Sequence, residues 1–415
     1  MRTFSPFICQ FHYYLLTLQN RNRNNEDREM KIAILTSGIL PIPAVQSGAV
    51  ENLVDVLLAY NDKHRLHDIT IFSIYHPDVE SHPAIRSDVN HYEYIHAQSF
   101  IYRLKAKWYS FFHRHEYYYY KLEYFFEQVY KRLRQQKYDL IILENRPGYA
   151  IKLKKRLFIP IISHIHTNQV YKPNPHTFEV IRSTTRFLTV SEYIKNEIQN
   201  LSPNSDVHVV YNGLDTMLFN KNVVPIKRDT FGFSNNDFVA VFCGRLVPNK
   251  GIKELLQALL LLKGYPDIKL MVIGNCEFAN GTNHNSFIDE LHQMVKSLGQ
   301  RVVFTGFMPY ANIPAHLLMA DVAVVPSHIN EAFGMVCIEA CAMGLPIIAT
   351  NDGGIPETLV GQKHILIDKH QPMPRQIADA LLTIKENTDA YTGNNLNSIF
   401  HTDNYAATFF KEIEL

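Results

Sequence analysis

A chain of 415 residues is long enough for two α/β domains, because such a domain takes roughly 100–200 residues. Apolar residues make up 46% and charged residues 20%, a composition typical of globular proteins that excludes a disordered chain. Lys and Arg number 41 against 40 Asp and Glu, so the chain lacks the positive excess of a general nucleic-acid binder.

Residues 1–29 are interpreted as an N-terminal extension outside the fold. Phe4–Leu18 is aromatic and apolar but is interrupted by Gln10 and His12. This stretch is shorter than the about 20 residues that a membrane-spanning helix needs, and no small-residue cleavage site follows it. The first strand pattern begins only at Met30.

From Met30 onward, strand and helix patterns alternate, which predicts parallel sheets covered by helices. In residues 30–217 the expected strands are mostly apolar and therefore buried: Lys31–Thr36, Asp68–Ser73, Asp139–Leu143, Ile159–Ser163 and Arg186–Val190. A turn at Asn212-Gly213 marks the boundary, because both residues tolerate positive φ angles. Residues 218–399 form a second α/β domain with expected strands at Phe238–Cys243, Lys269–Ile273, Val302–Thr305, Val322–Pro326 and Pro346–Ala349. Helices are expected at about Ala49–Tyr60, from Ser191 onward and at Ile252–Leu262.

Aromatic and basic residues interleave along Ile101–Lys137. The aromatic residues are Tyr102, Trp108, Tyr109, Phe111, Phe112, Tyr117–Tyr120, Tyr124, Phe125, Phe126 and Tyr130, and the bases are Arg103, Lys105, Lys107, Arg114, Lys121, Lys131, Arg132 and Arg134. One interpretation is that one or two amphipathic helices pack their aromatics into the first domain. The alternative is a basic-aromatic face that contacts an anionic membrane or a lipid-linked acceptor.

The five cysteines indicate neither a disulfide framework nor a paired Cys-x-x-Cys metal site. Cys337 and Cys341 lie one helical turn apart, and we expect buried apolar thiols there. A reducing cytoplasm fits this pattern.

The strongest candidate site follows the expected strand that ends at Pro326. A polar loop leads to a helix beginning near Phe333-Gly334, so free backbone N–H groups and the positive end of the helix dipole face the carboxyl end of the sheet. This is the usual phosphate position in an α/β protein. Glu331 in the loop can accept hydrogen bonds from sugar hydroxyls, and Glu339 on the helix can bind a ribose diol.

The second candidate site is the loop Gly244–Gly251, which follows the first strand of the second domain. Arg245 offers a planar fork for diphosphate oxygens, and Lys250 offers a mobile point charge. Two fixed cations stabilise the negative charge that develops on a departing diphosphate without a metal ion. No paired-aspartate motif lies in a suitable loop, so we expect no metal and no cofactor.

These motifs resemble glycosyltransferase family 4, whose members are retaining enzymes of the GT-B fold. The resemblance rests on Gly244-Arg245 with Lys250-Gly251, on the spacing of Glu331 and Glu339, and on Gly344-Leu345-Pro346. Further matches, in the order of the family, are Val190-Ser191-Glu192, Tyr211-Asn212-Gly213-Leu214-Asp215, Phe304-Thr305-Gly306 and Gly353-Gly354-Ile355-Pro356-Glu357. The resemblance covers roughly residues 30–415 and implies two Rossmann-like domains facing a central cleft.

The resemblance also implies roles for the candidate residues of the second domain. Arg245 and Lys250 would hold the donor diphosphate, Glu339 the ribose hydroxyls, and Glu331 the hydroxyls of the donor sugar. Backbone N–H groups would face the sugar and the β-phosphate at Phe333, Gly334 and Met335.

In the first domain, Gly48 resembles the glycine that lets a backbone loop approach the diphosphate, although Ala49 stands where the family commonly has a second glycine. His166 resembles the histidine that approaches the reacting sugar. His164 shares its face on a regular strand, so alternation alone does not choose between the two. The resemblance implies that residues 400–415 form a helix that crosses back to the first domain.

The expected function is transfer of a hexosyl group, with retention, from a nucleotide-diphosphate sugar, UDP more than GDP, to an acceptor hydroxyl. The resemblance implies a saccharide or lipid-linked acceptor and a role in surface polysaccharide or glycolipid biosynthesis. The cysteine pattern favours the cytoplasm, and the aromatic and basic segment allows a peripheral position at the inner face of the membrane. A non-catalytic sugar-nucleotide-binding protein of the same fold is the alternative. A dinucleotide-dependent oxidoreductase is disfavoured, because no Gly-x-Gly-x-x-Gly turn opens either domain.

Overall fold

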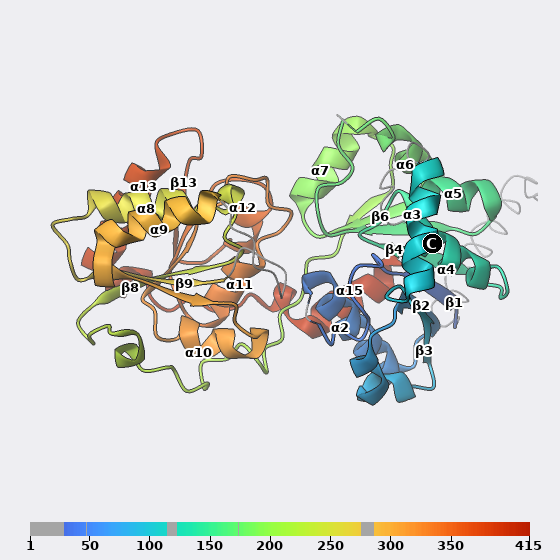
Figure 1. Cartoon of the computed structure of the whole chain (residues 1–415), viewed down its shortest axis with the longest axis horizontal. Helices are drawn as coiled ribbons and strands as arrows, with labels where there is room; N and C mark the ends of the chain where they lie inside the picture. The colour runs from blue at the N-terminus through green and yellow to red at the C-terminus, as the bar shows by residue number, and fades with distance from the viewer. Residues whose placement is uncertain (1–28, 47, 114–122, 173, 275–285) are drawn as a thin grey trace, which may run out of the picture. The chain divides into compact units, whose positions relative to one another are not determined.

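The computed structural model describes residues 29–46, 48–113, 123–172, 174–274 and 286–415. They form two sheets with helices on their faces (Figure 1), which confirms the α/β class predicted from the sequence. The predicted extension at residues 1–29 lies outside the described residues except for Glu29, and so do Cys9, Cys276 and Tyr117–Tyr120.

Contacts divide the chain into two compact units. The first contains the described residues up to Ile162 together with Phe409–Leu415, and the second contains Ser163–Thr408. The last seven residues therefore pack with the first unit, where the ring of Phe410 stacks on Tyr60 with 5.8 Å between centroids.

The first sheet has seven strands in the order β3-β2-β1-β4-β5-β6-β7. Its strands are β1 (Lys31–Leu35), β2 (Asp68–Ile74), β3 (Asn90–Ile95), β4 (Leu140–Glu144), β5 (Ile161–Ile165), β6 (Arg186–Thr189) and β7 (Val207–Val209). β1 pairs in parallel with β2 and β4, and all three are almost entirely buried, as expected of a parallel sheet covered on both faces. The five strands predicted here are confirmed, whereas β3, which is half polar, and β7, which has three residues, were missed.

Six α-helices accompany these strands in the described residues: α2 (Ala49–His64), α3 (Phe100–Phe112), α4 (Glu123–Leu133), α5 (Tyr149–Arg156), α6 (Thr177–Ser183) and α7 (Glu192–Leu201). Two short 3₁₀ helices follow β2, η1 (Pro77–Ser81) and η2 (Pro83–Arg86). The predicted start of α7 is confirmed, because the Ser191 hydroxyl caps it by accepting a hydrogen bond from the N–H of Ile194 at 3.2 Å.

The aromatic and basic segment forms the two helices α3 and α4. The predicted packing of aromatics into the interior is correct for α4, where Phe125 and Phe126 are buried. It is wrong for most of α3, which contains no buried residue. Only one side of α3 packs inward, where the rings of Tyr102 and Tyr109 contact the ring of Tyr124 on α4.

The second sheet has six strands in the order β10-β9-β8-β11-β12-β13. They are β8 (Phe238–Cys243), β9 (Ile268–Ile273), β10 (Val302–Gly306), β11 (Val322–Val325), β12 (Ile347–Thr350) and β13 (His364–Ile367), of which only β13 was not predicted. Along β8, Val239 and Val241 enter one hydrophobic cluster, and Ala240 and Phe242 enter another on the opposite face. The strand order reverses between β8 and β11, which is where α/β sheets bind ligands.

The α-helices that follow are α8 (Ile252–Leu261), α9 (Ser286–Leu298), α10 (Ile313–Leu317), α11 (Met335–Ala342), α12 (Ile355–Thr358), α13 (Met373–Glu386), α14 (Thr388–Tyr391) and α15 (Thr402–Glu412). Short 3₁₀ helices are η4 (Arg228–Phe231), η5 (Pro248–Lys250), η6 (Gly299–Arg301), η7 (Tyr310–Asn312) and η8 (Ser398–Phe400). Among the described residues, none of the helices is both long enough and apolar enough to cross a membrane.

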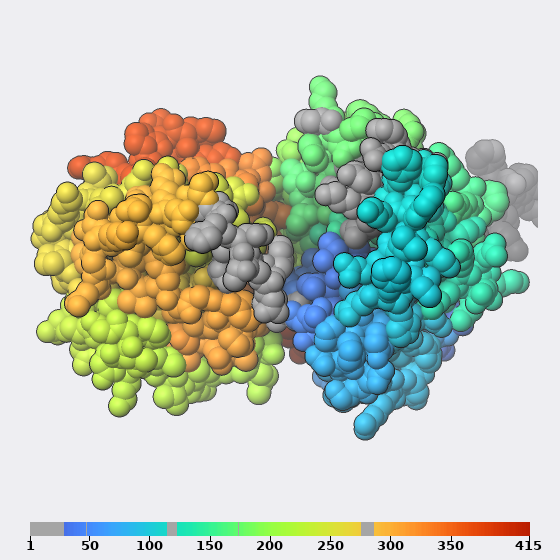
Figure 2. All heavy atoms as spheres, in the orientation of Figure 1, coloured from blue at the N-terminus to red at the C-terminus, as the bar shows by residue number. Residues whose placement is uncertain are grey.

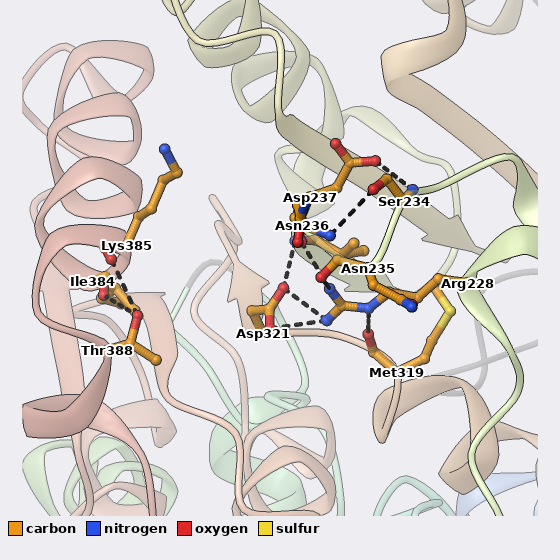
Figure 3. Close-up of polar contacts among 11 residues, drawn as sticks. Arg228, Ser234, Asn235, Asn236, Asp237, Met319, Asp321, Ile384, Lys385 and Thr388 are labelled. Carbon is orange, nitrogen blue, oxygen red and sulfur yellow. Dashed lines mark hydrogen bonds and ion pairs between the residues drawn. The ribbon is translucent and has the colours of Figure 1, made fainter.

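A polar network around Arg228 ties the segment before β8 to the start of β11 (Figure 3). One guanidinium nitrogen donates to both carboxylate oxygens of Asp321 at 2.9 Å, and the N–H of Val239 donates to the same carboxylate at 2.7 Å. The guanidinium also donates to the carbonyl oxygens of Met319 at 2.9 Å and Asp237 at 2.7 Å. These contacts fix the two central strands on which the candidate site is built.

Candidate active site

The loops after β8 and β11 meet at the point where the strand order reverses. Gly251 has φ 74°, and a Cβ atom there would lie 1.8 Å from the carbonyl oxygen of Pro326. The N–H of His328 donates to the carbonyl oxygen of Asn249 at 2.9 Å. Only glycine fits this close approach, so Gly251 allows the two predicted loops to form one surface.

Lys250 and Glu331 form an ion pair across these loops. The Lys250 ammonium contacts one carboxylate oxygen of Glu331, and the hydroxyl of Ser327 donates to the same oxygen at 2.8 Å. The side chains are 23% and 17% exposed, so both groups remain within reach of a ligand from solvent. Lys250 and Glu331, for which the sequence predicts separate roles, are therefore direct partners.

Glu339 lies on α11 and is buried. Its carboxylate accepts a hydrogen bond from the hydroxyl of Tyr310 at 2.9 Å. Burial raises the pKa of Glu339 to about 7, and the Tyr310 hydrogen bond partly opposes that shift. A carboxyl group poised near neutral pH inside a ligand-binding region is a common feature of functional sites.

The start of α11 carries the predicted backbone donors. Gly334 is the N-cap residue with φ 112°, Met335 begins the helix, and Phe333 before them is buried. Arg245 is exposed in the loop that carries Lys250. Arg245 and Lys250 thus lie in one loop, and Lys250 contacts Glu331, while the roles of all these residues stay predictions.

The backbone of Glu331 is held by the Gly353-Gly354 turn. The N–H of Gly354 donates to the carbonyl oxygen of Glu331 at 2.8 Å, and a Cβ on Gly353, which has φ 60°, would lie 2.2 Å from that oxygen. The side chain of Asn330 donates to the hydroxyl of Tyr193 at 2.8 Å, and Lys369 donates to the Asn330 side chain at 2.8 Å. These contacts fix the position of the loop that carries Glu331.

Glu357 links this turn to the start of α7. Its carboxylate accepts hydrogen bonds from the N–H groups of Glu192 at 2.8 Å and Tyr193 at 2.7 Å, and from the Tyr211 hydroxyl at 3.1 Å. A carboxylate is favoured there by the positive end of the helix dipole. The Ser191 hydroxyl donates to the carbonyl oxygen of Ala332 at 2.6 Å, next to Glu331.

His166 follows β5 and is buried, as is His164 within the strand. Their ring centroids are 4.1 Å apart. The two histidines therefore lie side by side in the second unit. The assignment of His166, and not His164, to the reacting sugar stays a prediction.

Gly48 is the N-cap residue of α2 in the first unit. A Cβ there would lie 2.2 Å from one carboxylate oxygen of Glu51. The Glu51 side chain is buried, and the Ser37 hydroxyl donates to its other carboxylate oxygen at 3.5 Å. Burial raises the pKa of Glu51. This acid in the first turn of α2 was not singled out from the sequence.

Three residues contact the candidate site or its supports, and the sequence analysis assigned none of them a role: Tyr310, Ser327 and Glu357. Tyr310 and Ser327 carry no motif of their own, since they act through the carboxylates of Glu339 and Glu331. Glu357 belonged to a recognised motif without a role. The predicted buried thiols are confirmed, because Cys337 and Cys341 are buried and burial raises both thiol pKa values.

Residues 54–218 match the family described as Glycosyltransferase Family 4, and residues 223–396 match the family described as Glycosyl transferases group 1. Spore coat protein SA of Bacillus subtilis is 30% identical over 368 residues, which cover 85% of this chain and 89% of that protein. D-inositol 3-phosphate glycosyltransferase of Corynebacterium glutamicum is 30% identical over 303 residues, covering 65% of this chain and 70% of the relative.

The fold is also similar to solved structures. Anabaena Alr3699/HepE, in complex with UDP and glucose, superposes with a TM-score of 0.67 and 21% identity, covering 93% of this chain and 99% of that chain. At 21% identity this similarity is evidence for the fold alone.

Proposed function

The chain belongs to glycosyltransferase family 4 and has the GT-B fold, and we propose that it moves a hexosyl group, with retention, from a UDP-sugar to an acceptor hydroxyl. The observation that carries the proposal is the joined pair of loops after β8 and β11. They combine Arg245, Lys250, Glu331 and the free N–H groups of α11 at the reversal point of a parallel sheet.

We propose that Arg245, Lys250 and the start of α11 receive the donor diphosphate. The acceptor hydroxyl attacks the anomeric carbon on the face from which the diphosphate departs, and the bond from that carbon to the diphosphate oxygen breaks. The hydroxyl proton passes to a diphosphate oxygen, and the cations stabilise the remaining negative charge of the diphosphate. Lys250 has three N–H donors, so it can hold a phosphate oxygen and Glu331 together. With these cations in place, we propose that the reaction needs no metal ion.

The remaining roles concern orientation of the donor. We propose that Glu339 binds the ribose hydroxyls, Glu331 the sugar hydroxyls, and Phe333, Gly334 and Met335 the sugar and β-phosphate through their N–H groups. His166 would act on the reacting sugar, and Gly48 would admit the diphosphate. These assignments follow the family pattern, and burial of Glu339 and Phe333 supports a pocket that excludes water.

The donor nucleotide, the domain roles and the acceptor complete the proposal. A UDP donor is supported by the Anabaena protein, whose structure holds UDP and glucose. We propose residues 30–217 as the acceptor domain, residues 218–399 as the donor domain and residues 400–415 as the returning helix. The acceptor would be a saccharide or lipid-linked glycan made at the cytoplasmic face of a membrane, in surface polysaccharide or glycolipid biosynthesis.

The test is a panel of UDP- and GDP-sugars offered to the purified full chain. A UDP-sugar should raise the melting temperature and be transferred or hydrolysed in the presence of a chelator, and the anomeric configuration of the product should match that of the donor. Arg245→Ala should lower donor affinity, with Lys411→Ala on α15 as the matched loss of a surface cation. Donor binding without any turnover would instead identify a non-catalytic binding protein and contradict the proposal.

A further inference from the structure

Helix α3 exposes an apolar face to solvent. The apolar residues on it are between 49% and 80% exposed: Phe100, Ile101, Leu104, Trp108, Phe111 and Phe112. An α-helix turns by about 100° per residue, so these six side chains fall within one arc of about 120°. Figure 2 shows α3, in cyan, at the molecular surface.

The opposite side of α3 makes the contacts with the rest of the first unit. The ring of Tyr102 meets Tyr124 of α4 edge-on at 4.9 Å, and the Tyr109 hydroxyl donates to Glu127 at 3.3 Å. Lys152 of α5 donates to the same hydroxyl at 3.1 Å. Packing on α4 and α5 therefore fixes the orientation of α3 and directs its apolar arc outward.

Basic residues border the apolar arc on both sides. On a helical projection Arg103 and Lys107 flank one edge and Lys105 flanks the other, and all three are exposed. Residues 100–112 contain no Asp or Glu. The helix thus combines an outward apolar face with positive flanks, which is the pattern of a helix lying in a membrane interface.

We propose that α3 docks the first unit onto an anionic lipid bilayer, with its axis in the membrane plane and its apolar arc among the acyl chains. At 13 residues the helix spans about 20 Å, too short to cross a bilayer. Lys is depleted at protein interfaces, whereas bases next to an apolar face match anionic headgroups. The inference does not depend on the proposed function.

Trp108 makes this proposal directly measurable, because it is the single tryptophan of the chain. The full-length protein is mixed with vesicles of phosphatidylcholine alone or with added phosphatidylglycerol. The emission of Trp108 should shift to shorter wavelength with the anionic vesicles, and lipids brominated on their acyl chains should quench it.

Variants separate the apolar and electrostatic contributions. Replacing Ile101, Leu104 and Phe112 with Ser should weaken vesicle binding about 1,000-fold, since each side chain contributes about ten-fold. Replacing Arg103, Lys105 and Lys107 with Gln should weaken binding to anionic vesicles about 100-fold, because each base contributes about five-fold. The same replacement should remove the salt dependence of vesicle binding.

The matched control is Phe158→Ser, which removes a fully exposed aromatic residue of the same unit outside α3 and should leave binding unchanged. Because all changed side chains are exposed, the melting temperature should stay the same. An unshifted Trp108 emission, or equal binding by the triple serine variant, would overturn the proposal. So would a shift that follows protein concentration without lipid, which would identify a second copy of the chain as the occupant.

Discussion

The substitution Glu339→Gln should stabilise the fold and weaken donor binding at the same time. The carboxyl group is buried, with the Tyr310 hydroxyl 2.9 Å away, and its pKa is raised to about 7 by burial. A buried carboxylate is costly for the fold, yet the proposed ribose contact needs its two acceptor oxygens. Glutamine keeps the shape and removes the charge.

The stability effect follows from the change in pKa between the unfolded and folded chain. The shift from 4.5 to about 7 is about 2.5 units, and at about 1.4 kcal/mol per unit it corresponds to about 3 kcal/mol. Because the folded pKa is the higher one, stability is fully present below pH 4.5 and is lost as the pH rises through 7. Glu339→Gln should therefore gain about 3 kcal/mol near pH 8 and little near pH 4.5.

Donor binding should show the opposite dependence on pH. If only the carboxylate form of Glu339 binds ribose, the apparent Kd of wild type at pH 6 is about ten-fold higher than at pH 8. UDP-glucose is the suitable ligand, because its pyrophosphate is esterified at both ends and does not titrate in this range. Glu339→Gln should bind UDP-glucose more weakly than wild type at pH 8. Its Kd should no longer show the change of about ten-fold between pH 6 and pH 8.

The assays are urea unfolding and calorimetric titration with UDP-glucose across pH 5–8.5. Tyr310→Phe serves as the comparison, because it removes the hydrogen bond that lowers the Glu339 pKa and should move the binding midpoint to higher pH. Equal stability of wild type and Glu339→Gln at pH 8, together with an unchanged pH profile of binding, would refute the reasoning.

Three other substitutions test the loops and their supports. Lys250→Ala should lower kcat about 100-fold, as expected for loss of one donor to the leaving oxygen, and Lys250→Arg should recover part of the rate in a transfer assay. Glu357→Ala should cost about 2 kcal/mol in urea unfolding and also raise the KM for the donor, because it frees α7 from the turn that holds Glu331. Asp321→Ala should cost a similar free energy of unfolding, about 2 kcal/mol, because Arg228 loses its carboxylate partner, while the Kd for the donor stays unchanged in titration.

Much of the fold follows from apolar runs in the sequence. Strands such as β1 and β8 are buried on both faces, so their residues are almost all apolar and stand out from the helices. β3 was missed because its sequence, Asn90–Ile95, carries polar and tyrosine residues at the edge of the sheet, where one side is solvated. β7 has only three residues, too few for a pattern. β13 lies at the edge of the second sheet, and only one of its four residues is buried.

The candidate site was predictable where residues follow strands that the pattern identifies. Lys250 and Glu331 come after β8 and β11, and the pairing of these strands brings the two loops together. The ion pair itself was not predictable, because it depends on the close approach of Gly251 to Pro326. Glu357 acts on a helix 164 and 165 residues away in sequence, and no local spacing encodes such a contact.

The direction in which α3 faces could not be decided from sequence either, and the reason is physical. Its helical projection carries apolar or aromatic residues on nearly every side, so either Tyr102 and Tyr109 or Phe100 and Trp108 could have formed the buried stripe. Tyrosine can pack inward here because Glu127 and Lys152 satisfy its hydroxyl. Phenylalanine and leucine have no polar group to satisfy, so their outward position has a cost in water, and an acyl-chain environment removes that cost.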